Sequence, residues 1–484
     1  MELRSFARGG LFGLVTLVVE KSVALLLVVG LARTLSPADY GRYSFLIAYL
    51  TLFQVLADLG TEIILLRRLA AEPRARGRLL AGALGLRVTL ALLAGSGAVI
   101  LAPWIDPGDP ELALRTALAA AALLLTGQPG YRALFRSELR MGVLLGVAAV
   151  TNVLVLLLVV LAVASGRGID GVFVAIALAN LGGFALAAVL ARKEFRFRLA
   201  VDVPLWRELL RESWPIGANV LVITIGMRVG PLLIMRLRGP VDVGYFSSAS
   251  RLTDALNLLG DAAMLSVYPL FVRYATARPD ALRALAELTA KLLGVILLGV
   301  ILVVSQTASD VMARLFRPEF AIAGPVLAVL SWSALLAALG NVYAHLLVAA
   351  GRQAVLFRVN CVAATLQVLL QLVLIRTLGL EGAAFAVVLT AVVSHATLFL
   401  LPETRTWVQP CVRAVAGVTA LAAVLLLLGS LLPLGPYARA ATLLLLFALA
   451  LLTSGMAGPA DVRRLRALLQ AHDTPVAPPT PLQA

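Results

Sequence analysis

Two short stretches of the sequence, 203 residues apart, share one pattern of residues. The first is RTLSPADYGRY at residues 33–43, and the second is RLRGPVDVGYF at residues 236–246. An arginine, a proline, an aspartate and a glycine occupy matching places: Arg33, Pro37, Asp39 and Gly41 in the first, Arg236, Pro240, Asp242 and Gly244 in the second. Proline, aspartate and glycine favour turns and helix starts, so each stretch predicts a tight connection between two helices.

The match continues beyond the two loops. After each loop come three polar residues spaced three and four apart, which form one stripe on a helix face: Thr51, Gln54 and Asp58 after the first, Asp254, Asn257 and Asp261 after the second. Arg87 and Lys291 match at an offset of 204, and GIDG (residues 168–171) matches GLEG (residues 379–382) at an offset of 211. The alternative is a chance match between residues that are common in turns.

This pattern predicts that six helices are repeated by the next six in the same orientation. Parallel repeats of this kind are typical of transporters, in which the substrate site lies between the two halves.

The composition is that of a membrane protein. Of the 484 residues, 61% are hydrophobic and only 14% are charged, and the mean hydropathy is +0.96. A soluble domain is about a quarter charged, and the strands of a porin are far less apolar per segment. These values exclude a soluble enzyme, a disordered chain and a porin. The net charge of +15 is spread over short loops rather than gathered on one face, which argues against nucleic-acid binding.

Apolar runs of about 20 residues predict roughly 14 membrane-spanning helices. We place them at residues 9–34, 42–64, 79–103, 112–131, 143–165, 171–190, 213–235, 244–271, 287–310, 323–349, 357–375, 383–401, 414–432 and 438–456. The predicted fold is an all-α polytopic membrane protein, with two six-helix lobes around a central cavity and two extra helices at the C-terminal end.

The predicted lobes are residues 1–195 and 213–402, joined by a cytoplasmic linker at 196–212. Residues 403–457 hold the two extra helices, and residues 458–484 form a partly disordered tail. Within the tail, residues 460–472 predict a short amphipathic helix on the membrane surface. Lysine and arginine are much more frequent in the loops on one side, so the positive-inside rule predicts that both termini are cytoplasmic.

Charged side chains inside the predicted spans are costly and need a reason. Lys21 lies in the middle of the first span, next to Glu20, and Arg228 and Arg251 lie in the seventh and eighth spans. The planar guanidinium group matches diphosphate oxygens, so these cations predict a cavity for an anionic head group. The alternative is interhelical pairing that only fixes packing, such as Lys21 with Asp58 or Arg228 with Glu20.

Other polar residues in the spans are weaker candidates for the cavity or for ion coupling: Glu20, Gln54, Asp58, Asp254, Asn257, Asp261, His345, Gln367 and Gln371. His345 and also His395 suit a proton relay, but a neutral histidine bonded to a neighbour is commoner. Gln367 and Gln371 suit sugar hydroxyls or plain hydrogen bonds between helices. Arg87 and Lys291 lie near the cytoplasmic ends of their spans. Two alternatives are open for them: binding a ligand, or extending the charged group to the membrane–water interface.

Several kinds of chemistry have no matching motif in the sequence. There is no phosphate-binding loop of the G-x-x-x-x-G-K-[ST] type, no H-E-x-x-H, no G-x-S-x-G and no Cys/His cluster. We therefore expect no catalysis, no cofactor and no metal.

The loop at residues 31–43, the following ADLG at residues 57–60 and the pair Arg67 and Arg68 resemble a known family. They resemble the polysaccharide biosynthesis (oligosaccharide) flippases of the multidrug, oligosaccharidyl-lipid and polysaccharide exporter superfamily. The second loop, at residues 238–246, resembles the loop between helices 7 and 8 of that family.

The resemblance implies two six-helix lobes around a V-shaped cavity in the bacterial inner membrane. It implies alternating access that moves an undecaprenyl-diphosphate-linked glycan from the cytoplasmic to the outer leaflet, with H⁺ or Na⁺ as the candidate coupling ion. It also implies a cationic cavity, a role that Lys21, Arg228 and Arg251 suit, although Glu20 departs from the family pattern. Polysaccharide polymerases or glycosyltransferases are candidate partners.

Three other functions stay open at this point. A cation-coupled multidrug antiporter would favour acidic and aromatic cavity residues. A lipid II flippase would have the same requirements for cavity charge as the oligosaccharide flippase. A membrane glycan polymerase or glycosyltransferase fits poorly, because it needs catalytic residues on outside loops and here only short turns carry acids.

Overall fold

The computed structural model describes residues 23–106, 108–126, 129–138, 140–192 and 200–470. Nearly all of these residues are helical, and none of them is in a strand. Contacts between residues divide the chain into two units, which we describe separately: unit 1 runs up to Ser247, and unit 2 begins at Ser248.

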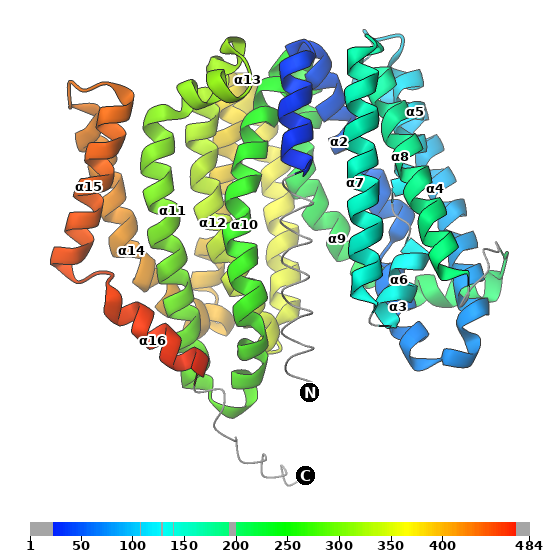
Figure 1. The fold of residues 1–484 in the computed structure, drawn as a ribbon. Helices are drawn as coiled ribbons and strands as arrows, with labels where there is room; N and C mark the ends of the chain where they lie inside the picture. Colours follow the sequence, from blue (N-terminus) through cyan, green and yellow to red (C-terminus); the bar gives the residue numbers. More distant parts are fainter. Residues whose placement is uncertain (1–22, 107, 127–128, 139, 193–199, 471–484) are drawn as a thin grey trace. The chain divides into compact units, whose positions relative to one another are not determined.

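Within the described residues, unit 1 contains ten helical segments before α10 (Figure 1). They are a helix at Val23–Thr34, then α2 (Pro37–Asp58), α3 (Thr61–Ala71), the 3₁₀ turn η1 (Pro73–Ala75), α4 (Arg76–Ile105), α5 (Leu112–Thr126), α6 (Pro129–Ser137), α7 (Met141–Ala164), α8 (Gly168–Ala191) and α9 (Val203–Arg238). Helix α10 (Pro240–Ala277) begins in unit 1 and continues into unit 2.

Unit 2 contains the remaining helices (Figure 1). They are α11 (Pro279–Leu315), the 3₁₀ turn η2 (Pro318–Ala323), α12 (Gly324–Ala349), α13 (Gln353–Leu400), α14 (Pro402–Ser430), α15 (Pro436–Ser454) and α16 (Pro459–Gln470). Helix α11 packs against α12, α14, α15 and α16. The main apolar cluster of unit 2 lies along these contacts and includes Phe271, Leu297, Leu346, Val408 and Phe447.

Eleven helices within the described residues are long and apolar enough to cross a membrane. This number agrees with the predicted spans once three features are taken into account. Helix α13 extends over 48 residues, is interrupted by a non-helical backbone conformation at Gly379, and covers two predicted spans. Two shorter apolar helices, Val23–Thr34 and Leu112–Ala122, lie within two further predicted spans. The chain is therefore an all-α, multi-pass membrane protein.

The matching GIDG and GLEG segments, one in each unit, both begin with a glycine of positive φ. Gly168 and Gly379 both have positive φ angles, 57° and 64°, which glycine tolerates without steric cost. Three residues later, a Cβ atom on Gly171 would lie 2.4 Å from the Cβ of Arg167, and one on Gly382 would lie 1.9 Å from the Leu374 carbonyl oxygen. Both segments thus need glycine at the same two places, as the predicted repeat requires.

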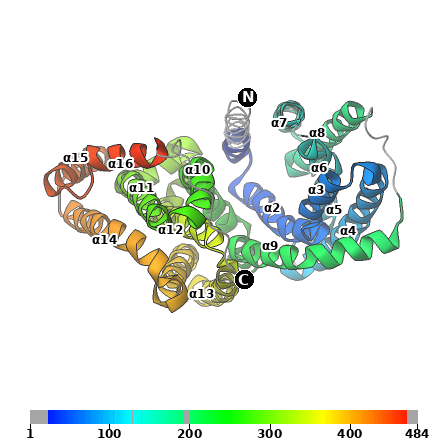
Figure 2. The ribbon, with the colours of Figure 1, turned by 90° about the horizontal axis from the view of Figure 1, so that it is seen from below.

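The boundary between the two units falls within α10, and the lobes at 1–195 and 213–402 stay a prediction. Helix α9 belongs to unit 1 because it packs against α2, α3 and α4 (Figure 2). A Cβ atom on Gly217 of α9 would lie 2.6 Å from the Leu59 carbonyl, where α2 ends, so the two backbones touch directly. Leu59 and Gly60 have positive φ angles of 45° and 77°, and they separate α2 from α3.

The start of α9 gives a pH-dependent prediction. Asp202 caps this helix by accepting the Leu205 backbone N–H at 3.1 Å, and Arg78 Nε donates to its other oxygen at 2.7 Å. The bond from Arg78 and, next, the capping bond lower the pKa of Asp202. A lowered carboxyl pKa stabilises the fold above the unfolded value of about 3.9, and this contribution is lost as the pH falls through the folded value.

We therefore expect faster hydrogen exchange in the first turn of α9 below about pH 4, after correction for intrinsic rates. An Asp202→Asn variant keeps a side-chain cap without a titrating charge, so this pH step should disappear in it. An equal pH-dependent rise in exchange in the wild type and in Asp202→Asn would assign the effect to another titrating group.

Candidate functional site

The two loops that match in sequence lie against each other in unit 1. A Cβ atom on Gly41 would lie 1.7 Å from the Pro240 carbonyl oxygen, and one on Gly244 would lie 2.5 Å from the Pro37 carbonyl oxygen. Each glycine thus contacts the first residue of the helix that starts at the other loop. The contact is reciprocal, as expected where a twofold axis relates two copies of one motif.

An ion-pair network surrounds the start of α2. Asp109 lies 2.9 Å from Arg115 Nη1 and 3.3 Å from Arg42 Nε. Arg42 also lies 3.2 Å from Asp39, and Arg115 lies 3.4 Å from Asp170. The sequence showed acids only on short outside turns and gave no sign that these acids gather around two arginines. The one available signal in the sequence is the position of Arg42 and Arg115 at the start of predicted spans, where each arginine needs an acidic partner.

Arg87 and Asp58, two predicted site residues in unit 1, form an ion pair. Arg87 Nη1 donates to Asp58 Oδ1 at 2.6 Å, and the side chains are 18% and 28% exposed. Asp58 also accepts the Gly60 backbone N–H at 3.2 Å. Asp58 thus neutralises a cation and orients the start of α3. Its observed partner is Arg87; Lys21, the partner suggested by the sequence, lies outside the described residues together with Glu20.

The corresponding residues of unit 2 have different partners. Lys291 Nζ donates to Asp461 of α16 at 2.8 Å, and Asp261, which matches Asp58 in sequence, accepts from Asn341 Nδ2 at 2.9 Å. The repeated cation is therefore paired in both units, but the acid comes from a helix outside the repeat in unit 2. The sequence predicted α16 and gave no signal for this pairing.

Arg228 and Arg251 are both partly buried. Arg228 lies in α9 of unit 1, and Arg251 lies in α10 of unit 2 with Nη1 4.0 Å from Asp254 Oδ2. Gln54 on α2 is also partly buried, and Asn257 Oδ1 has no hydrogen-bond partner among the described residues. A cavity shared by Arg228 and Arg251 stays a prediction, because the two arginines belong to different units.

The two membrane histidines are bonded within their own helices. His345 Nδ1 lies 2.8 Å from the Asn341 carbonyl oxygen, one turn earlier, and its ring meets Tyr268 edge-on with centroids 4.8 Å apart. His395 Nδ1 lies 2.7 Å from the Ala391 carbonyl oxygen. Each ring nitrogen thus lies within hydrogen-bond distance of the preceding turn of its own helix, and a proton relay stays a prediction.

Gln367 and Gln371 of α13 are buried inside unit 2, with exposed fractions of 4% and 1%. Gln367 Nε2 and Gln371 Oε1 have no hydrogen-bond partner within the described residues. Burying unpaired amide groups in an apolar interior is costly. These two side chains therefore keep hydrogen-bonding capacity in the interior of unit 2.

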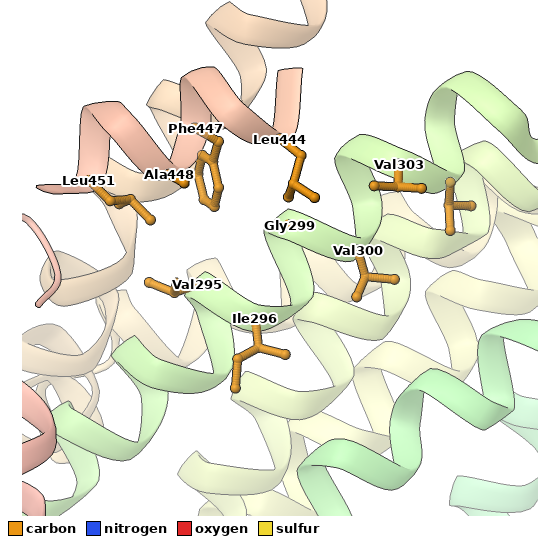
Figure 3. Close-up of a pocket in the computed structure, with 10 residues that line it drawn as sticks. Val295, Ile296, Gly299, Val300, Val303, Leu444, Phe447, Ala448 and Leu451 are labelled. Carbon is orange, nitrogen blue, oxygen red and sulfur yellow. The ribbon is translucent and has the colours of Figure 1, made fainter. Parts of the chain in front are cut away.

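An apolar cavity of about 460 Å³, which is wide open to the surface, lies between α11 and α15 in unit 2 (Figure 3). Only apolar residues line it, among them Ile296, Gly299, Val303, Leu444 and Phe447. Gly299 has no side chain to fill the space opposite Leu444. The shape and chemistry of this cavity suit a hydrocarbon chain and offer no group to bind a polar ligand.

Comparison with known proteins identifies the family. The sequence model of the polysaccharide biosynthesis protein family matches residues 6–275, which is more than half of the chain. The chain belongs to the polysaccharide biosynthesis protein family. The matched region of this family member includes both copies of the loop motif and the predicted cations Lys21, Arg228 and Arg251. No curated protein matches the sequence of this family member.

Solved structures show that this family member has the fold of a flippase and of multidrug transporters. The lipid II flippase MurJ in an inward closed conformation has a TM-score of 0.70 and 11% identity, and the match covers 92% of this chain and 99% of MurJ. An inward-facing multidrug resistance MATE family transporter of the MOP superfamily has a TM-score of 0.63 and 17% identity, covering 81% and 95% of the two chains.

The Vibrio cholerae MATE transporter VcmN in its bent form has a TM-score of 0.51 and 15% identity, with coverage of 84% of this chain and 95% of VcmN. At these identities the likeness establishes the fold. Together with the family match, it makes this chain a multi-pass membrane protein of the polysaccharide biosynthesis family with a flippase-like transporter fold, related in structure to transporters rather than to enzymes.

Proposed function

We propose that this chain moves an undecaprenyl-diphosphate-linked oligosaccharide from the cytoplasmic to the outer leaflet of the bacterial inner membrane. The product serves export or the assembly of a cell-surface polysaccharide. The observation that carries the proposal is the presence of arginines inside the predicted spans of a polysaccharide biosynthesis protein with a transporter fold. Transport proceeds by alternating access between the lobes at 1–195 and 213–402, without ATP hydrolysis by this chain.

The head group of the substrate is the part that the cations recognise. Arg228 and Arg251 present planar guanidinium groups that match diphosphate oxygens, and Lys21 adds a point charge. Arg251 Nη1 lies 4.0 Å from Asp254 Oδ2. This distance is long for an ion pair, so a diphosphate can replace the carboxylate at modest cost.

The polyprenyl tail stays in the lipid at the edge of the lobes while the sugars cross in the polar lumen. The apolar cavity between α11 and α15 supports this assignment, because its lining suits an isoprenoid chain. Gln367 and Gln371 are candidates to bind sugar hydroxyls when the lumen is open.

Coupling comes from a gradient of H⁺ or Na⁺, or from consumption of the glycan on the outer side. In this proposal both termini are cytoplasmic, in agreement with the distribution of lysine and arginine over the loops. Polymerases or glycosyltransferases that use the flipped glycan are the expected partners.

A lipid II flippase is the second candidate. The MurJ match, which covers 92% of this chain and 99% of MurJ, favours it, and lipid II offers the same diphosphate to the same cations. A cation-coupled multidrug antiporter is supported by the MATE likeness but would favour acidic cavity residues over arginines.

A leaflet-exchange experiment tests the diphosphate assignment. Purified protein is reconstituted in liposomes, and transfer of a short-chain polyprenyl-diphosphate glycan between leaflets is followed for wild type, Lys21→Ala, Arg228→Ala and Arg251→Ala. We expect each variant to lose about tenfold or more in rate, because a charge-assisted hydrogen bond contributes about 1.5–3 kcal/mol. Arg207→Ala, which removes an exposed cation from the same α9 helix as Arg228, is the matched control.

Folded variants that keep the wild-type rate would remove these residues from the head-group site. Failure of the wild type with several glycans, together with gradient-driven efflux of cationic dyes, would assign the chain to the multidrug antiporters instead. Exchange of lipid II alone would select the second candidate.

A further inference from the structure

Helix α16 is fixed to unit 2 by a polar contact near each end. Near its start, Asp461 accepts from Lys291 Nζ of α11 at 2.8 Å. Near its end, the Tyr274 hydroxyl of α10 donates to the Leu468 carbonyl oxygen at 2.8 Å. Between these contacts, Leu465 and Leu468 pack against the main apolar cluster of unit 2. Leu465 and Leu468 therefore face protein, whereas Val462 is exposed.

These contacts place α16 at the edge of the membrane. Lys291 lies just inside the start of the predicted span at 287–310, and Tyr274 lies just beyond the end of the predicted span at 244–271. Helices α10 and α11 are consecutive and antiparallel, so both residues belong to the same end of the bundle (Figure 1). A helix bonded to both lies along the boundary between hydrocarbon and head groups.

A tryptophan at the same end of unit 2 also indicates that this end lies at the level of the lipid head groups. Trp407 precedes the predicted span at 414–432 on α14, and Arg283 of α11 lies over its ring at 4.8 Å from the centroid. Tryptophan is enriched at the level of the head groups.

The outward side of α16 is strongly basic. Arg463, Arg464 and Arg466 are all exposed, and no acid within the described residues forms an ion pair with them. Asp461, the one acidic residue of α16, is engaged by Lys291. Three uncompensated arginines are thus presented at the level of the phospholipid head groups, where negative charge attracts them.

We propose that Arg463, Arg464 and Arg466 bind the phosphates of anionic phospholipids in the leaflet next to α16. The occupant is the lipid itself, because the rigid attachment of α16 holds the three guanidinium groups at the bilayer edge. This site is separate from the diphosphate-binding cations of the proposed transport cavity.

The test measures thermal unfolding of the full-length protein in an uncharged detergent at low salt. Dioctanoyl phosphatidylglycerol is compared with dioctanoyl phosphatidylcholine at equal concentration. We expect the anionic lipid to raise the Tm above the zwitterionic lipid, because a ligand that binds only the folded state stabilises it. In R463Q/R464Q/R466Q this difference should disappear, with affinity falling about fivefold for each arginine removed.

The control variant R74Q/R207Q/R211Q loses the same charge from exposed positions in unit 1 and should keep the full difference. An equal loss in both variants would overturn the proposal in favour of a general charge effect. Stabilisation by free glycerol 1-phosphate would overturn it in favour of a soluble phosphate site. The single variant Arg464→Gln, with an expected affinity loss of about fivefold, provides the same comparison if the triple variant is poorly folded without lipid.

Discussion

Replacing Gly41 by alanine is expected to destabilise unit 1 by about 1–3 kcal/mol or more. The added Cβ atom would lie 1.7 Å from the Pro240 carbonyl oxygen. The carbonyl oxygen is a backbone atom, and the backbone fixes the position of a Cβ atom. No rotamer change relieves this overlap, so the two repeated loops have to separate. Thermal unfolding in detergent measures the loss as a lower Tm.

Gly146→Ala is the matched control, because Gly146 is also helical and a Cβ atom added there would have nothing within 4 Å. This variant should be neutral or slightly stabilising, since alanine has a higher helix propensity than glycine. Gly244→Ala should fall between the two, because its Cβ would lie 2.5 Å from the Pro37 carbonyl oxygen. Equal Tm values for Gly41→Ala and Gly146→Ala would show that the loops are not in close contact.

Removing Asp58 is the second change with a large expected effect. Asp58→Ala leaves Arg87 without its 2.6 Å partner at a side chain that is only 18% exposed. Breaking a fully buried pair costs about 3–5 kcal/mol, and the loss at this partly buried pair should approach the lower end of that range because the remaining charge is poorly solvated. The double variant Asp58→Ala/Arg87→Met removes both charges and should recover much of that loss.

A double-mutant cycle on the free energy of unfolding gives the coupling between the two residues. Arg317 and Glu319 serve as a comparison pair, since they lie 3.0 Å apart with side chains 28% and 53% exposed. Glu319→Ala should cost about 1 kcal/mol or less. Additive effects at Asp58 and Arg87 would mean that the pair contributes no net coupling.

The spans and the repeat were predictable because both rest on local pattern. Apolar runs identify the helices, and the places of Gly168 and Gly379 in GIDG and GLEG anticipate the backbone breaks that the structure has there. The contacts of Gly41 with Pro240 and of Gly244 with Pro37 join positions that the offset of 203 relates to each other, although the offset alone gives no distance.

The partners of the charged residues were not predictable, because pairing depends on which helix faces meet when the chain folds. The sequence suggested Lys21 only as an example of a partner for Asp58, and within the described residues Asp58 pairs with Arg87. It offered no partner for Lys291, whose acid lies 170 residues away. Glu20 and Lys21 lie outside the described residues, so their roles stay predictions, as does the shared cavity of Arg228 and Arg251.

The pairing of Lys291 with Asp461 has a consequence for the order of membrane insertion. Asp58 is synthesised 29 residues before Arg87, so the first cation enters the bilayer when its counter-charge is already there. Lys291 enters 170 residues before Asp461 leaves the ribosome. The ion pair of Lys291 in the second half of the protein therefore forms only when α16, the last helix within the described residues, has been made.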